Sequence, residues 1–201
     1  MVEALRLPEL CQQVRERYDH DEKRVVGIMM ARYDLDITKA IVEQNYQYWH
    51  CNTRKYIDVF WAGYGAYLPP NDETSTKTIL NFSGNTQRVY FDLDAFIEIK
   101  DQFNNHFSTP YEDKLQLILV NYHDGQLWFN ESLKIDLEEN LDANYAKIRE
   151  IMEFVTKECR SEHEVAPIAA KLKLGHLKNI IKGITISDAI STVIGIAGLK
   201  A

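Results

Sequence analysis

One short apolar run decides how the rest of the chain is interpreted: residues 25–31, with the sequence VVGIMMA. It lacks the alternation of a strand that has one face in water. A continuous run of this length is typical of a strand covered on both faces, as in a parallel sheet. Residues 56–62 (YIDVFWA) and 115–121 (LQLILVN) are similar runs. The three runs predict the buried strands of a central mixed sheet. The side chains expected to be almost inaccessible are those of Ile28, Val59 and Ile118.

Helix-period sequence separates these runs. Apolar residues recur at helical spacing over residues 3–18, after residue 36, from residue 92 onwards and over residues 142–160. Strand, helix and strand in succession form a βαβ unit, and a right-handed crossover makes its two strands parallel. Asp34 or Asp36 is available to cap the helix of this unit.

Turn signals organise the second half of the chain. Residues 78–82 and 88–91 are expected to form a hairpin. Asp124-Gly125 predicts a second, tight hairpin, with residues 127–129 returning antiparallel to the third buried strand. Pro167 is expected at the first position of a further helix.

The predicted fold is α/β: a single three-layer domain with a mixed sheet. An N-terminal helix precedes the order β-α-β, hairpin insert, α, β-hairpin, α. This order resembles that of the thioredoxin-like class, and a resemblance of element order implies a fold but no activity. We expect the α/β domain to span residues 1–164 and a C-terminal helical appendage to span residues 165–201.

Charge is unevenly distributed along the 201 residues, whose net charge is −7. Residues 165–201 carry five lysines against one acid, a charge of +4, so residues 1–164 carry −11. An acidic body of this kind repels phosphate backbones, so we expect no nucleic-acid partner. The composition, 45% hydrophobic and 26% charged, is that of an ordinary globular protein.

The three cysteines, Cys11, Cys51 and Cys159, have no short spacing between them. That pattern indicates neither a disulfide framework nor a zinc site. A thioredoxin-type redox site would need two cysteines two residues apart at a helix N-terminus, which the chain lacks. With no apolar run long enough to span a membrane and no signal peptide, we expect a soluble protein of the cytoplasm.

Two segments place paired aspartates between a strand and a helix: residues 33–38 (YDLDIT) and 91–96 (FDLDAF). The first fits the DxDxT motif of haloacid-dehalogenase-like phosphatases, and the second resembles the strand-end motif of the same family. The resemblance covers six residues at each place. It implies that the first Asp is a nucleophile, that the second is an acid or base, and that Mg²⁺ is bound.

The chain departs from that family in its other parts. Arg32-Tyr33 stands where the family keeps an apolar strand, and the third strand ends in residues 121–124 (NYHD) with a single acid. An aspartate between strand and helix also caps the helix by accepting backbone N–H bonds, which is the interpretation we favour. We therefore expect no catalytic constellation, no metal site and no cofactor.

If a small ligand binds, we expect it at one edge of the sheet. Open α/β sheets bind ligands at the carboxyl ends of their strands, where helix N-termini and loop amides are exposed. The Gly63-Tyr64-Gly65 segment closes the second strand there, although two glycines also permit a tight exit from a sheet. The candidate ligand-binding residues are Arg32, Asp34, Asp36, Gly63, Tyr64, Asp92 and Asp94.

The C-terminal segment is unlike the rest of the chain. Leu177, Ile180, Ile181 and Ile184 form a helical stripe, and residues 186–199 are apolar and almost uncharged. This segment either packs on the body or docks on a protein partner or a second copy. A membrane surface is a third, less favoured possibility. The candidate partner-binding residues are Ile186, Ile190, Val193, Ile194 and Leu199.

Two functions follow from these patterns. The first is a non-catalytic interaction or sensor module of the cytoplasm with a C-terminal docking or assembly segment. The alternative is a small-molecule phosphohydrolase or nucleotide-binding enzyme that uses the carboxylates at the strand ends. Because no catalytic constellation is complete, the first hypothesis is favoured.

Overall fold

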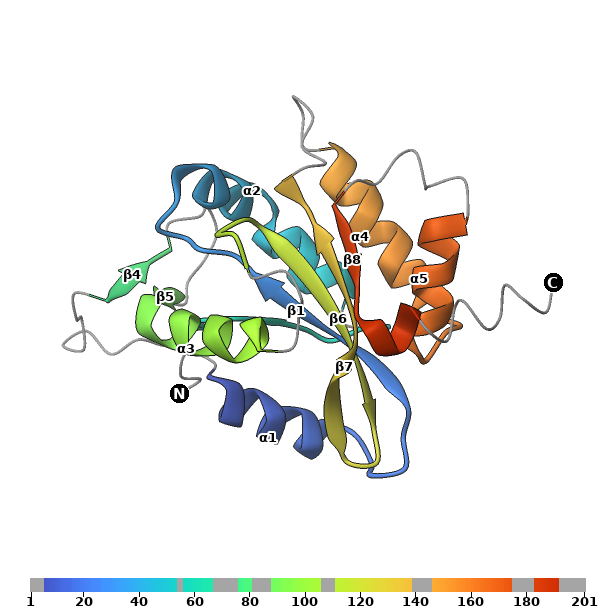
Figure 1. Cartoon of the computed structure of the whole chain (residues 1–201). Coiled ribbons are helices and arrows are strands. Elements are labelled where there is room, and N and C mark those ends of the chain that lie inside the picture. The colour runs from blue at the N-terminus through green and yellow to red at the C-terminus, as the bar shows by residue number, and fades with distance from the viewer. Residues whose placement is uncertain are drawn as a thin grey trace.

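A five-stranded mixed sheet forms the centre of the protein (Figure 1). The structure, a computed structural model, describes residues 6–53, 56–66, 76–80, 88–105, 111–138, 146–174 and 183–191. The strands lie in the order β2-β1-β6-β7-β8; β1 and β2 are parallel and the other neighbours are antiparallel. Their bounds are β1 (Arg24–Met30), β2 (Val59–Trp61), β6 (Gln116–His123), β7 (Gln126–Asp136) and β8 (Ile184–Ile186).

A smaller antiparallel sheet extends from the carboxyl end of β2. Its strands lie in the order β3-β5-β4. Their bounds are β3 (Tyr64–Gly65), β4 (Lys77–Ile79) and β5 (Tyr90–Asp92). Gly63 makes the turn from β2 into β3 with a φ of +75°, and a Cβ there would lie 2.8 Å from both the carbonyl oxygen of Asp92 and the Cβ of Phe96. Only glycine fits this turn, so the tight exit expected from the glycines is confirmed at Gly63.

Helices cover both faces of the five-stranded sheet. Phe60 and Trp61 are adjacent in β2, so their side chains point to opposite faces. Arg17 of α1 lies over the Phe60 ring, whereas Trp49 of α2 stacks on Trp61. α3 contacts α1, α4 contacts α2, and α5 packs on β6 and β7. The helices are α1 (Leu7–Arg17), α2 (Asp36–Thr53), α3 (Leu93–Asn104), α4 (Ala146–Glu158) and α5 (Val165–Leu174), with a short helix at 188–191.

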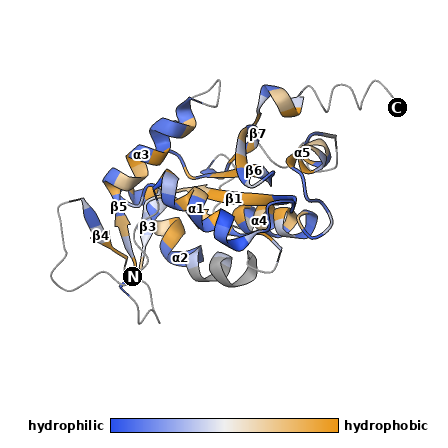
Figure 2. Ribbon diagram, turned by 90° about the horizontal axis from the view of Figure 1, so that it is seen from below, coloured by the Kyte–Doolittle hydropathy of each residue, from blue (hydrophilic) through white to orange (hydrophobic). Residues whose placement is uncertain are grey.

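The predicted mixed α/β architecture is therefore confirmed, with apolar strands enclosed between amphipathic helices (Figure 2). Ile28 and Ile118 are buried in the core, as expected. Val59 is only partly buried, so that prediction is wrong, because β2 is the last strand at its end of the sheet. β2 is also shorter than the apolar run that predicted it.

Both predicted hairpins form. The β6–β7 turn lies at Asp124 and Gly125, which have φ values of 51° and 72°. β7 continues to Asp136, well past the predicted 127–129, because the apolar Leu133 and Ile135 pair with β6 beyond a bulge. β4 pairs with β5 as expected, and the turn between them lies outside the described residues.

The predicted helices form with shifted ends. α3 buries Phe96, Ile99 and Phe103, which recur at helical spacing after residue 92. α4 lies within the predicted 142–160. α5 begins two residues before Pro167, which was expected to start it.

The predicted C-terminal helix is wrong at Ile184. Residues Ile184–Ile186 form strand β8, which pairs with β7 through Leu133, Lys134 and Ile135. Isoleucine and threonine are β-branched and favour strands once a sheet edge is available to pair with. The other members of the predicted stripe, Leu177, Ile180 and Ile181, lie outside the described residues.

Candidate functional site

The carboxyl end of β1 carries a charged cluster. The loop from β1 to α2 brings Arg32 beside Asp34, and the guanidinium donates to both carboxylate oxygens. Nε lies 3.0 Å from Oδ1, and Nη2 lies 2.6 Å from Oδ2. This bidentate pairing raises the pKa of Arg32 and lowers the pKa of Asp34. Both groups therefore stay charged through the neutral pH range.

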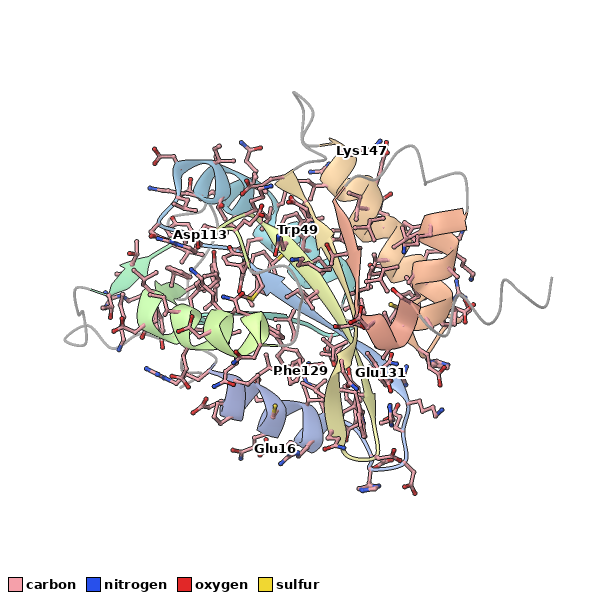
Figure 3. All side chains as sticks on the ribbon, viewed as in Figure 1. Glu16, Trp49, Asp113, Phe129, Glu131 and Lys147 are labelled. Atoms are coloured by element: carbon pink, nitrogen blue, oxygen red, sulfur yellow. The ribbon has the colours of Figure 1, made fainter. Side chains whose placement is uncertain are left out.

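The same guanidinium contacts a second carboxylate. Arg32 Nη1 lies 3.1 Å from Asp113 Oδ1, and Lys100 Nζ of α3 lies 3.4 Å from the same oxygen. Asp113, in the segment before β6 (Figure 3), has a φ of 58°, a conformation uncommon outside glycine. The charged cluster thus consists of Arg32, Asp34, Lys100 and Asp113. Two cations balance two carboxylates, so it offers no excess charge to an ionic ligand.

Buried tyrosine hydroxyls lie close to the charged cluster. Tyr64 donates to the carbonyl oxygen of Ala31 at 3.0 Å. The hydroxyl of Tyr111 is buried and has no hydrogen-bond partner among the residues that the structure describes. Burial raises the pKa of both hydroxyls, and Asp113 raises that of Tyr111 further. Both tyrosines are therefore protonated and cannot act as bases near neutral pH.

The remaining candidate residues form a second group at the start of α3. Asp92 N–H donates to the carbonyl oxygen of Gly63 at 2.7 Å. The Asp92 carboxylate accepts from the N–H groups of Asp94 and Ala95 at 3.1 and 3.3 Å. Asp92 is therefore the N-cap of α3, as the capping interpretation predicts. Asp94 lies in the first turn of α3 and is exposed.

The two aspartate-containing segments differ in how their first aspartate is bound. The Asp34 carboxylate accepts hydrogen bonds from the Arg32 side chain, whereas the Asp92 carboxylate accepts them from the N-terminus of its own helix. Asp36 begins α2 and is exposed. Within the described ranges, no three His, Cys, Asp or Glu side chains come together in a way that could hold a metal ion. The arrangement binds its own loops together.

Sequence reasoning missed Lys100 and Asp113. Both are distant from Arg32 in the chain, and Asp113 is brought to it by the first residues of β6 pairing with the end of β1 at Met30 and Gln116. The sequence contains only a weak signal, the charged residues 112–114 immediately before an apolar run.

The candidate partner-binding residues divide into two sets. Ile186 lies in β8 and is partly buried, and Ile190 is 3% exposed and belongs to the core. Ser187 accepts a hydrogen bond from the N–H of Ser132 at 3.1 Å, which fixes the end of β8 to β7. Val193, Ile194 and Leu199 lie outside the described residues. The start of the segment thus packs on the body.

Two cysteines are placed by the structure. Cys11, in α1, and Cys159, at the end of α4, are free thiols. Burial raises the pKa of Cys11, and it raises that of Cys159 to about 12. Neither is the activated thiolate that redox chemistry needs.

None of the described helices is long and apolar enough to cross a membrane. Comparison of the chain with protein-family models, with curated proteins and with solved structures gives no match.

Proposed function

We propose that the protein is a non-catalytic interaction module of the cytoplasm that docks through its C-terminal segment, beginning at β8. The observation that carries the proposal is the backbone of β8. Ser187 N–H donates to Ser132, and Asp136 N–H donates to Gly183. Hydrogen-bonded pairs alternate along an antiparallel ladder, so Thr185 bonds to β7 while the N–H and C=O groups of Ile184 and Ile186 point away from it.

An outward row of backbone groups on a short edge strand is the feature that β-augmentation uses. We propose a second copy of the chain as the occupant. Two β8 strands paired about a two-fold axis through Thr185 set Ile184 of each copy opposite Ile186 of the other. In the sequence, Lys182 precedes the strand and Asp188 follows it, so antiparallel pairing would bring unlike charges of the two copies near one another at each end.

The charged cluster supports a non-catalytic role. Arg32 is shared between Asp34 and Asp113, and Asp92 caps α3, so these carboxylates are engaged in holding loops in place. The phosphohydrolase alternative requires Asp34 to attack a substrate, which would mean giving up its bidentate pairing with Arg32.

Two finer features belong to the proposal. The strand order β2-β1-β6-β7, with one parallel and two antiparallel pairings, supports a thioredoxin-like element order. The free thiols of Cys11 and Cys159 support a reducing compartment such as the cytoplasm.

A pair of proline variants tests docking at β8. Ile186→Pro removes an outward N–H, which edge strands tolerate, whereas Thr185→Pro removes the N–H that bonds to β7. Sedimentation velocity should show a wild-type dimer and an Ile186→Pro monomer with a similar melting temperature. Thr185→Pro should lower the melting temperature instead. A wild-type chain that stays monomeric up to its solubility limit contradicts self-association.

A thermal-shift screen separates this proposal from the enzymatic alternative. A nucleotide or metal ion at about 100 times its dissociation constant adds about 2.7 kcal/mol of stability. We expect no such shift from Mg²⁺, nucleotides or phosphorylated sugars. A shift that Asp34→Asn abolishes would favour the phosphohydrolase.

A further inference from the structure

His123, at the end of β6, stands between two carboxylates. Its Nδ1 lies 2.9 Å from Asp124 Oδ2, and its Nε2 lies 3.2 Å from Glu131 Oε2. The ring stacks on the indole of Trp128, with centroids 4.8 Å apart and planes 8° from parallel. Trp128 Nε1 donates in turn to the carbonyl oxygen of His123 at 3.1 Å. The imidazole is therefore held on one face, with a carboxylate at each nitrogen.

Only the doubly protonated ring satisfies both carboxylates. A neutral imidazole has one N–H donor and one bare nitrogen, and the bare nitrogen would face a carboxylate lone pair. Burial lowers the pKa of His123, but the hydrogen bonds with Asp124 and Glu131 outweigh it and leave the pKa above its ordinary value. The geometry is that of an imidazolium.

Glu131 connects this histidine to helix α5. Its Oε2 also accepts from Asn121 Nδ2 at 2.8 Å. Asn121 Oδ1 accepts from the backbone N–H of Val165, the first residue of α5, at 2.7 Å. Asn121 and Val165 are both buried, so a lost bond at this junction is not easily replaced by water. A chain of hydrogen bonds thus runs from His123 to the N-terminus of α5.

The other charges around the ring have their own partners. Lys23, in the segment before β1, lies near Asp124 and Glu131 but bonds Glu164 at 2.8 Å. His20 lies against Gly125 at the tip of the hairpin and pairs with Asp21 at 3.0 Å. His123 is therefore the titratable group that contacts both carboxylates directly.

We propose that His123 is a proton-operated latch between the β6–β7 hairpin and the N-terminus of α5. As an imidazolium it holds Glu131, which orients Asn121 to accept from Val165. When the ring loses the proton at Nε2, Glu131 loses its donor and the bond between Asn121 and Val165 loosens. The latch is closed at lower pH and opens as the pH rises through the folded-state titration of His123. It is independent of docking at β8.

Two NMR measurements on the full chain test the latch between about pH 5.5 and pH 8.5. One is the titration of the His123 ring, and the other is the protection factor of the Val165 amide, which corrects for intrinsic exchange. We expect the protection factor to fall with the same midpoint as the His123 titration. The fall should be about tenfold for each unit by which the folded pKa exceeds the ordinary value.

Three variants test whether the pH dependence of Val165 protection arises from His123 and Glu131. His123→Gln and Glu131→Gln should each remove the pH dependence of Val165 protection. His163→Gln, at an exposed histidine two residues before α5, should retain it and is the matched control. A wild-type His123 midpoint at or below about 6.5 overturns the proposal even if a variant fails to fold. Val165 protection that does not change with pH, or that changes equally in His123→Gln, overturns it as well.

Discussion

At each end of the central sheet one cationic side chain bridges two carboxylates, but the cation differs. At the carboxyl end of β1, Arg32 bridges the carboxylates of Asp34 and Asp113; at the opposite end, His123 bridges those of Asp124 and Glu131. The labelled Asp113 and Glu131 mark the two ends in Figure 3. An arginine stays charged at any physiological pH, whereas a histidine titrates there. The same geometry is therefore a fixed brace at one end and a pH-dependent contact at the other.

Each bridge contains an aspartate whose backbone has a positive φ. Among the described residues, the two non-glycine positions with positive φ are Asp113 and Asp124, one at each end. Aspartate tolerates this conformation better than most residues because its short polar side chain bonds locally. In each case the carboxylate is turned toward the bridging cation.

The largest expected loss of stability is at Gly63, one of the two glycine turns that lie near the bridges. Gly63→Ala would set a Cβ against the backbone of Asp92 and the buried Phe96, neither of which can move without shifting α3. Gly125→Ala would meet only the His20 side chain, which is mostly exposed and free to move aside. Overpacking and a strained φ together should destabilise Gly63→Ala by about 3 kcal/mol. The strained φ alone should destabilise Gly125→Ala by about 1 kcal/mol.

Urea denaturation followed by circular dichroism measures both glycine variants against the wild type. Equal losses of stability would show that the surroundings of the two turns do not differ in rigidity as the contacts indicate.

The strands and the hairpin that carry the two bridges could be predicted from the sequence, but the contacts within the bridges could not. Continuous apolar runs predicted β1 and β6, and Asp124-Gly125 predicted the hairpin on which His123 lies, because burial and turn chemistry are local signals. The contact between His123 and Glu131 was not predicted, because Glu131 lies in a bulge that no sequence pattern marks. The pairing of Arg32 with Asp113 is likewise non-local, since it depends on which strands become neighbours.

The same reasoning explains the errors. Ile184 continued a helical stripe in the sequence, but the edge of β7 was open to it, and strand pairing replaced the local pattern. Val59 belongs to an apolar run as long as that of β1, yet β2 lies at the end of the sheet and is covered less completely. Position within the sheet, which the sequence does not encode locally, decides both outcomes.

Asn121→Ala should have the next largest effect. It removes the acceptor of the buried Val165 N–H and one donor to Glu131, and an unsatisfied buried group costs about 1–3 kcal/mol. We expect a loss of about 2 kcal/mol in urea denaturation. Asn130→Ala, at an exposed position of the same hairpin, is the control and should change stability by less than about 0.5 kcal/mol. Similar losses for the two variants would mean that the junction with α5 contributes no more to stability than an exposed position of the hairpin.

Arg32→Met should have a moderate effect that is independent of pH near neutrality. It keeps most of the side-chain volume but leaves Asp34 and Asp113 without their shared cation. Because these groups are partly exposed, solvent screening limits the loss to about 1 kcal/mol. The pKa of Asp34 is lowered in the folded protein, so its contribution is present above the unfolded value and is lost only as the pH falls below it. The difference between Arg32→Met and the wild type should therefore be constant between about pH 6 and pH 9.

The smallest expected loss of stability is that of His123→Gln, and it depends on pH. The pKa of His123 is raised by folding, so its stabilisation is fully present below the unfolded value and disappears as the pH rises through the folded one. His123→Gln should therefore be less stable than the wild type at about pH 5.5, by less than about 1 kcal/mol because the ring is partly exposed, and equal to it at about pH 9. Urea denaturation of His123→Gln and Arg32→Met in one pH series checks the contrast directly. If the two differences from the wild type run parallel across the series, the two bridges respond to protons alike, and the distinction between a fixed brace and a titrating one is wrong.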